Sequence, residues 1–151
     1  MHEFFVSYLS LLTERHGDMA QVIDGLAPEA LAWSPGAGMN SLQILVVHTA
    51  GAERYWIGDV AGQLPSGRVR AQEFATSGWT VPQLKGLLEE TLSHSRGVVE
   101  DLSFFQLKEM RLSSRNGRFY TVAWALNHAL EHTALHLGHM QIGRQLWEQR
   151  D

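Results

Sequence analysis

Four of the eight histidines lie in one stretch near the C-terminus, and their spacing suits metal binding. His128, His132 and His136 recur every four residues, and His139 follows three residues later, so on an α-helix all of them share roughly one face. Two imidazoles at positions i and i+4 can both reach one ion that lies about 2.1 Å from each nitrogen. The stretch therefore predicts a helix that supplies two ligands to one metal ion.

Spacing alone leaves two ligand pairs open. His128 and His136 would lie about 12 Å apart along the helix axis, so all three residues cannot bind the same ion. Either His128 and His132 or His132 and His136 form the pair, and His132 belongs to both.

A third candidate ligand, His48, lies in a different predicted helix. It is the polar residue on an otherwise apolar face whose members recur at helical steps: Leu42, Leu45, Ala52, Tyr55 and Trp56. Burying an imidazole costs free energy unless its nitrogens find partners, and an ion shared with the C-terminal histidines would be such a partner. Three protein ligands with one open position are typical of catalytic zinc sites.

Two other metal chemistries are disfavoured. His128, Glu131 and His132 match the inverted zinc-protease motif H-x-x-E-H, but such a protease needs a further ligand and a peptide cleft, and few residues follow His132. A carboxylate-bridged di-iron site needs Glu-x-x-His motifs on two helices, and the sequence contains none. Glu131 and His128 remain candidates for proton relay beside a metal-bound water.

The remaining polar residues give weaker signals. His16 is interpreted as a helix-surface or core histidine, and His2 and His94 receive no role. The segment from Lys108 to Arg118 holds the only local basic excess, which is typical of a solvated loop but could also hold an anionic substrate.

Composition excludes several classes of function. The net charge of -4 and the pI near 6.0 disfavour general binding to nucleic acid or to acidic membranes. The absence of cysteine excludes disulfides, thiolate ligands and a cysteine nucleophile. The N-terminal residues lack the pattern of a signal peptide, and no apolar run is long enough to span a membrane, so we expect a cytoplasmic protein.

Hydrophobic periodicity predicts four long amphipathic helices and no substantial sheet, which favours an all-α four-helix bundle in one domain, residues 1–151. The first helix is expected from His2 to about Asp24, the second from Asn40 or Ser41 to near Gly58, the third from Val81 to about Leu102, and the last over Thr121 to Trp147. A short turn is expected at 28–31, a long irregular crossover at 59–79 between helices two and three, and a hairpin around Asn116-Gly117.

The sequence resembles the DinB-like superfamily of small metal-binding four-helix proteins. The resemblance covers nearly the whole chain and is most specific in two runs, Pro35 to His48 and His132-x-x-x-His136-x-Gly138. It implies that His48, His132 and His136 are the ligands and that His128 lies beside them. Many relatives carry a glutamine where this chain has His139. The resemblance also implies a homodimer.

The resemblance implies three classes of function. Some relatives are transferases or isomerases that use a low-molecular-weight thiol, so a metal-dependent enzyme of this type, acting on a small-molecule substrate, is the first hypothesis. A metal-dependent hydrolase is the second. A non-catalytic metal-binding or stress-related protein is the third. Three imidazoles suit zinc, nickel, iron or copper, and of these we expect zinc or nickel first and iron next.

Overall fold

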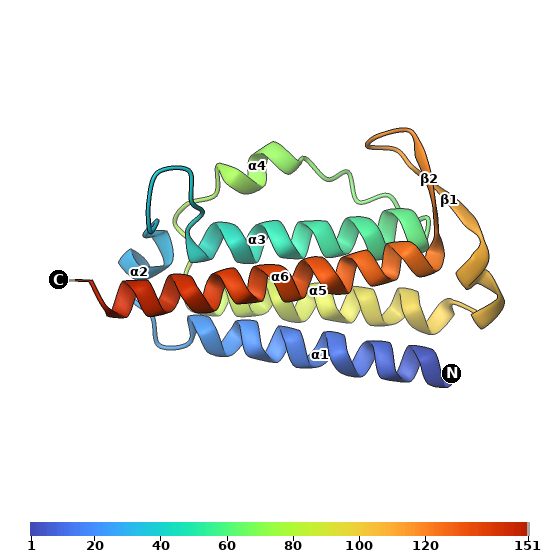
Figure 1. The fold of residues 1–151 in the computed structure, drawn as a ribbon, viewed down its shortest axis with the longest axis horizontal. Coiled ribbons are helices and arrows are strands. Elements are labelled where there is room, and N and C mark those ends of the chain that lie inside the picture. Colours follow the sequence, from blue (N-terminus) through green and yellow to red (C-terminus); the bar gives the residue numbers. More distant parts are fainter. Residues whose placement is uncertain (151) are drawn as a thin grey trace.

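The computed structural model describes residues 1–150, and it confirms the prediction of an all-α four-helix bundle (Figure 1). The four long helices are α1 (Glu3–Ile23), α3 (Leu42–Glu53), α5 (Val81–Asp101) and α6 (Val122–Glu148). Shorter helical segments are α2 (Pro28–Ala32), α4 (Arg70–Phe74) and the 3₁₀ turn η2 (Phe104–Lys108). Among the described residues, no helix is both long and apolar enough to cross a membrane.

Polar side chains define where the long helices begin. The hydroxyl of Ser41 accepts a hydrogen bond from a backbone N–H in the first turn of α3, and Thr121 does the same for α6. Thr80 and Gln83 form a reciprocal capping box at the start of α5. These caps fix the residues at which α3, α5 and α6 begin.

The second long helix runs further than its sequence predicts. It does not end near Gly58 but continues in a wider helical form, η1 (Arg54–Ala61), until the Gly62 N–H donates to the carbonyl of Ile57 at 2.8 Å. Gly58 is required for packing and not for termination, because a Cβ there would lie 2.6 Å from Nε2 of His94 on α5.

The crossover between η1 and α5 is long, as predicted, but it is not wholly irregular. It contains α4, which lies alongside α3 on the outside of the bundle (Figure 1). A helix of this length has too few residues to show a hydrophobic period, so the sequence gives no signal for it.

A short hairpin precedes the last helix, as predicted. Strands β1 (Met110–Ser113) and β2 (Arg118–Thr121) pair antiparallel, with Met110 opposite Thr121. Gly117 adopts a positive φ of 68° in the turn, a conformation that side chains disfavour. The hairpin leads directly into α6 and therefore sets the position of its first turn.

The core consists of two apolar clusters, with a polar layer between them along the bundle axis. In this layer Nε2 of His16 lies 2.7 Å from Oε2 of Glu53, and the Ser95 hydroxyl donates to the other carboxylate oxygen at 2.6 Å. The second nitrogen of His16 lies 3.1 Å from the carbonyl oxygen of Leu88. His16 is therefore a hydrogen-bonded core histidine, which was one of the two sequence interpretations.

Candidate metal centre

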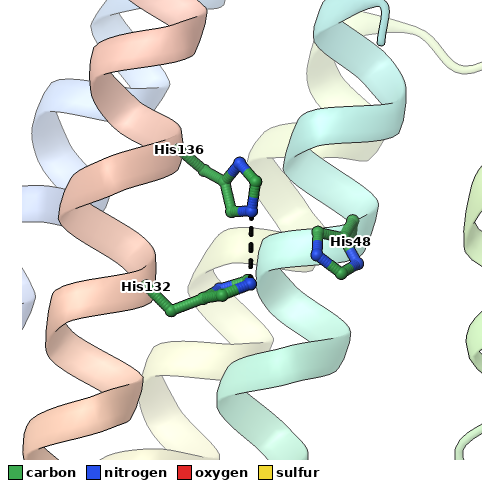
Figure 2. A group of neighbouring side chains, drawn as sticks. All are labelled: His48, His132 and His136. Atoms are coloured by element: carbon green, nitrogen blue, oxygen red, sulfur yellow. Dashed lines mark hydrogen bonds between the residues drawn. The ribbon is translucent and has the colours of Figure 1, made fainter. Parts of the chain in front are cut away.

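Helices α3 and α6 bring together three of the predicted histidines, His48 from α3 and His132 and His136 from α6 (Figure 2). His48, His132 and His136 each offer one nitrogen, and these nitrogens lie within 4.8 Å of one another. The Nε2 atoms of His132 and His136 are 3.2 Å apart. The His48 ring centroid lies 5.0 Å from the centroid of each of the other two rings.

His128 lies outside this cluster, one helical turn away. Its ring stacks on Trp124 with 4.7 Å between centroids and meets the edge of Trp56 at 4.9 Å. Its centroid is 6.1 Å from that of His132. Of the two pairs that spacing leaves open, the fold therefore groups His132 and His136 with His48.

Glu73, in α4, contacts the cluster and was missed by the sequence analysis. One of its carboxylate oxygens lies 2.8 Å from Nδ1 of His48, and Arg68 donates to both oxygens at 2.5 and 2.9 Å. Burial alone would raise the pKa of Glu73, but the hydrogen bonds from Arg68 and His48 outweigh burial and hold this pKa below its ordinary value. Glu73 is therefore a carboxylate that accepts the Nδ1 proton of His48, which leaves the Nε2 lone pair of His48 free.

His139 makes a comparable contact with the second histidine of the cluster. Its Nδ1 lies 3.3 Å from Nδ1 of His136, so it can accept the proton on that nitrogen. In that arrangement Nε2 of His136, the atom that faces His132, carries a lone pair. The position of His139 three residues after His136 is the sequence signal for this contact.

The cluster favours neutral imidazoles. Burial, together with the proximity of His136 and His48, lowers the pKa of His132 to about 3. Burial and His48 lower the pKa of His136 to about 4. At neutral pH both rings are uncharged and can donate lone pairs, which is the form in which histidine binds metals.

The arrangement fits a divalent cation. Nδ1 of His132 is buried and has no hydrogen-bond partner in residues 1–150, so the ring is held by packing, with Nε2 directed at His136. With protons on Nδ1 of His48 and of His136, the Nε2 lone pairs of these two rings are free to bind an ion, and Nε2 of His132 lies 3.2 Å from Nε2 of His136. Such a nitrogen donor set suits zinc, nickel or iron.

Glu131 does not join the cluster. Its side chain is 78% exposed, and its carboxylate lies 3.5 Å from Nδ1 of His128. It lines the same surface depression as Leu11 and Arg15 of α1, on the side of α6 away from His48. The catalytic role predicted for Glu131 and His128 therefore rests on their contact with each other.

The basic segment runs from Lys108, the last residue of η2, through β1 and the turn to Arg118, the first residue of β2. Arg111 pairs with Glu109 at 2.5 Å and also contacts Gln63, and the backbone N–H of Arg115 donates to the Tyr55 hydroxyl at 3.1 Å. None of these basic residues contributes to the lowered pKa of His132. The arginine that does so is Arg68, in the crossover.

Comparison with known proteins agrees with this fold. A family model described as mycothiol-S-transferase matches residues 8–149. No curated protein matches the chain by sequence. Two solved structures from Bacillus subtilis share the fold. One is a DinB-like protein, with a TM-score of 0.73 and 16% identity over 96% of this chain and 94% of that chain. The other is YfiT, described as a probable metal-dependent hydrolase, with a TM-score of 0.72 and 13% identity over 99% of this chain and 91% of that chain.

A third solved structure is a mycothiol-dependent maleylpyruvate isomerase. It matches with a TM-score of 0.66 and 17% identity, over 91% of this chain and 62% of that chain. At these identities the structural matches show the fold, and the family model, which spans nearly the whole sequence, shows the family. The chain belongs to the mycothiol-S-transferase family and shares the fold of a DinB-like protein.

Proposed function

We propose that His48, His132 and His136 hold one divalent metal ion and that the protein is a metal-dependent transferase joining a low-molecular-weight thiol to an electrophile. The observation that carries the proposal is the convergence of three imidazole nitrogens within 4.8 Å, in a chain of this family. Zinc and nickel are the favoured ions, and iron is compatible with the same ligands.

A bound ion would supply a positive charge that lowers the pKa of a nearby thiol. The chain contains no cysteine, so the sulfur belongs to a cosubstrate. The family name and the description of the isomerase both support mycothiol in that role. An isomerase would use the same thiol by adding it to the substrate and releasing it again.

The chain's own residues position and protect this site. Glu73, held by Arg68, fixes the ring of His48, and Phe74 covers that ring with 4.8 Å between centroids, which excludes water from one side. His128 lies one turn from His132 with its Nδ1 near Glu131, so we assign to this pair the removal of the thiol proton.

A hydrolase is the alternative that the same geometry supports. Water in the open position would then be the nucleophile, and His128 with Glu131 would accept its proton. A metal-binding protein without turnover is the third possibility. From the resemblance we further infer a homodimer, and from the sequence a cytoplasmic protein in which residues 1–151 form one domain.

Dependence on thiol separates these functions. We expect the zinc- or nickel-loaded protein to consume 1-chloro-2,4-dinitrobenzene only when mycothiol is added, with release of chloride and formation of the thioether. His48→Ala should reduce the enzymatic rate at least 100-fold, because it removes a proposed ligand. An enzymatic rate that is the same without thiol would favour the hydrolase, and no rate above the uncatalysed reaction would favour the non-catalytic protein.

A further inference from the structure

An apolar hollow adjoins the histidine cluster on the side away from Glu73. It has a volume of about 290 Å³ and lies between α6 and the loop that precedes α3. Nine residues line it: Pro35, Gly38, Met39, Asn40, Leu45, His136, His139, Ile142 and Gly143. His136 therefore belongs both to the cluster and to the wall of this hollow.

The lining of the apolar hollow carries no lysine, arginine or carboxylate. Two of its apolar side chains, Met39 and Ile142, stay 51% and 53% exposed to solvent. A molecule with an apolar body gains free energy by covering these side chains, whereas a carboxylate placed among them finds no lysine or arginine to pair with.

The two sides of the cluster therefore differ in chemistry. On the side of His48, the crossover supplies the buried charges of Arg68 and Glu73. On the side of His136, the wall is almost entirely apolar. A thiol with a polar body suits the first side, and an uncharged apolar reactant suits the second.

We propose that the apolar hollow binds the apolar body of the electrophile, a short alkyl chain or a single ring, so that this chain acts on uncharged electrophiles in preference to carboxylates. This inference rests on the proposed thiol-transferase function. Small-molecule pockets usually occupy about 300–1,000 Å³, so the hollow is at the lower limit of that range. It has space for roughly ten groups the size of a water molecule.

The reaction of a terminal epoxide illustrates the proposed arrangement. The thiolate sulfur forms a bond to the terminal carbon, the bond from that carbon to oxygen breaks, and the oxygen keeps the electron pair. A proton from solvent then gives the hydroxy-thioether, which balances the proton lost by the thiol. The alkyl chain of the epoxide would lie against Met39 and Ile142 while its reactive carbon lies near His136.

Ligand binding to the metal-free protein tests the hollow independently of turnover. We expect 1-hexanol to shift the NMR signals of the Met39 and Ile142 methyl groups and to bind at least tenfold more tightly than hexanoate. Ile142→Trp should weaken 1-hexanol binding at least tenfold by filling the hollow. The matched control is Leu135→Trp, an exposed position on the same helix outside the hollow, and it should change the affinity less than twofold.

Three results would overturn the inference. The first is an equal affinity for 1-hexanol and hexanoate. The second is an equal loss of 1-hexanol affinity in Ile142→Trp and Leu135→Trp. The third is that a second copy of the chain covers the hollow in solution, so that 1-hexanol cannot bind. None of these results requires metal or thiol, so they are distinguishable from a failure of the proposed function. With the metal-loaded protein and mycothiol, 1,2-epoxyhexane should have a kcat/KM at least tenfold above that of 5,6-epoxyhexanoate, and Ile142→Lys should narrow this ratio.

Discussion

The two nitrogens of His48 have different roles. Nδ1 donates to Glu73, and the bidentate contact with Arg68 keeps Glu73 ionised and fixed. A histidine ligand held in this way has a defined tautomer and a defined ring orientation. The carboxylate is therefore expected to raise metal affinity without touching the ion.

Substitution of Glu73 tests this role. Glu73→Gln keeps a hydrogen-bond acceptor but removes the charge, so we expect metal affinity to fall about 10- to 100-fold. Glu131→Gln is the matched control, since Glu131 contacts His128 and not a proposed ligand. The metal affinity of this variant should stay within twofold of the wild-type value. Competition with a chromophoric chelator measures both affinities. Equal losses in the two variants would show that Glu73 has no positioning role.

The lowered pKa values predict how the metal-free protein responds to pH. Unfolded histidines bind protons below about pH 6.5, whereas His132 and His136 in the folded state resist protonation until about pH 3 and pH 4. The unfolded state therefore binds more protons between these limits, and the free energy of unfolding should fall as the pH falls from 6.5 toward 4. The slope stays below about 1.4 kcal/mol per pH unit for each imidazole, because the unfolded state can bind at most one more proton per imidazole than the folded state.

Urea denaturation of metal-free protein across this pH range measures the effect. The double variant His132→Gln with His136→Gln should show a clearly shallower slope, since it lacks both titrating groups. A slope that is the same in the two proteins would contradict the neutral-imidazole description.

At the residue scale, the sequence predicted the histidines but not their supporting contacts. His132 and His136 follow from helical spacing, and His48 follows from its apolar surroundings. Spacing could not choose between His128 and His136, because that choice depends on the level at which α3 crosses α6. Glu73 could not be predicted, because nothing in an irregular crossover indicates where a side chain will return to the bundle.

At the scale of elements, the approach of the crossover to α3 depends on one glycine. A Cβ at Gly51 would lie 2.2 Å from Oε1 of Glu73 and 2.9 Å from its carboxyl carbon. Arg68 and His48 hold that carboxylate in place, so it cannot move aside without breaking their hydrogen bonds. Gly51 is thus required for the contact between α4 and His48.

Gly51→Ala should displace Glu73 and weaken metal binding by a factor similar to that of Glu73→Gln. Gly86→Ala is the matched control, because Gly86 lies inside α5 with nothing near its absent side chain, and it should stabilise the fold by roughly 0.5–1 kcal/mol without changing metal affinity. Metal affinity and thermal unfolding of the two variants check both expectations. Unchanged metal affinity in Gly51→Ala would mean that the crossover tolerates the extra methyl group.

The elements themselves were largely predictable. Four amphipathic patterns predicted the four long helices, and polar residues predicted where these helices begin. The turn at Asn116-Gly117 predicted the hairpin. The extension of the second helix through Gly58 was missed because glycine usually favours helix ends, and only the close approach of His94 from α5 explains it.

At the scale of the whole molecule, the polar layer joins three helices of the bundle. His16 of α1 and Ser95 of α5 both contact Glu53 at the end of α3, and all three side chains are buried. Removing one partner of a buried hydrogen-bonded network strongly destabilises the fold, because the remaining partners keep their desolvation cost.

Glu53→Ala should therefore lower the free energy of unfolding by about 3–5 kcal/mol. The matched control is Glu90→Ala, which removes an exposed ion pair with Arg54 and should cost at most about 1 kcal/mol. Denaturant unfolding of the metal-free proteins measures both values. A loss below about 1 kcal/mol in Glu53→Ala would show that the polar layer is not a determinant of stability.

The central claim is that α3 and α6 hold one ion between His48, His132 and His136. Metal analysis of zinc-loaded protein after dialysis at pH 7 tests it most directly, with His94→Ala as the control because His94 packs against η1, away from the cluster. We predict about one ion per chain for the wild type and for the control, and less than a tenth of that for His48→Ala, His132→Ala or His136→Ala. Full occupancy in any one of these three variants, or no bound ion in the wild type, would contradict the account.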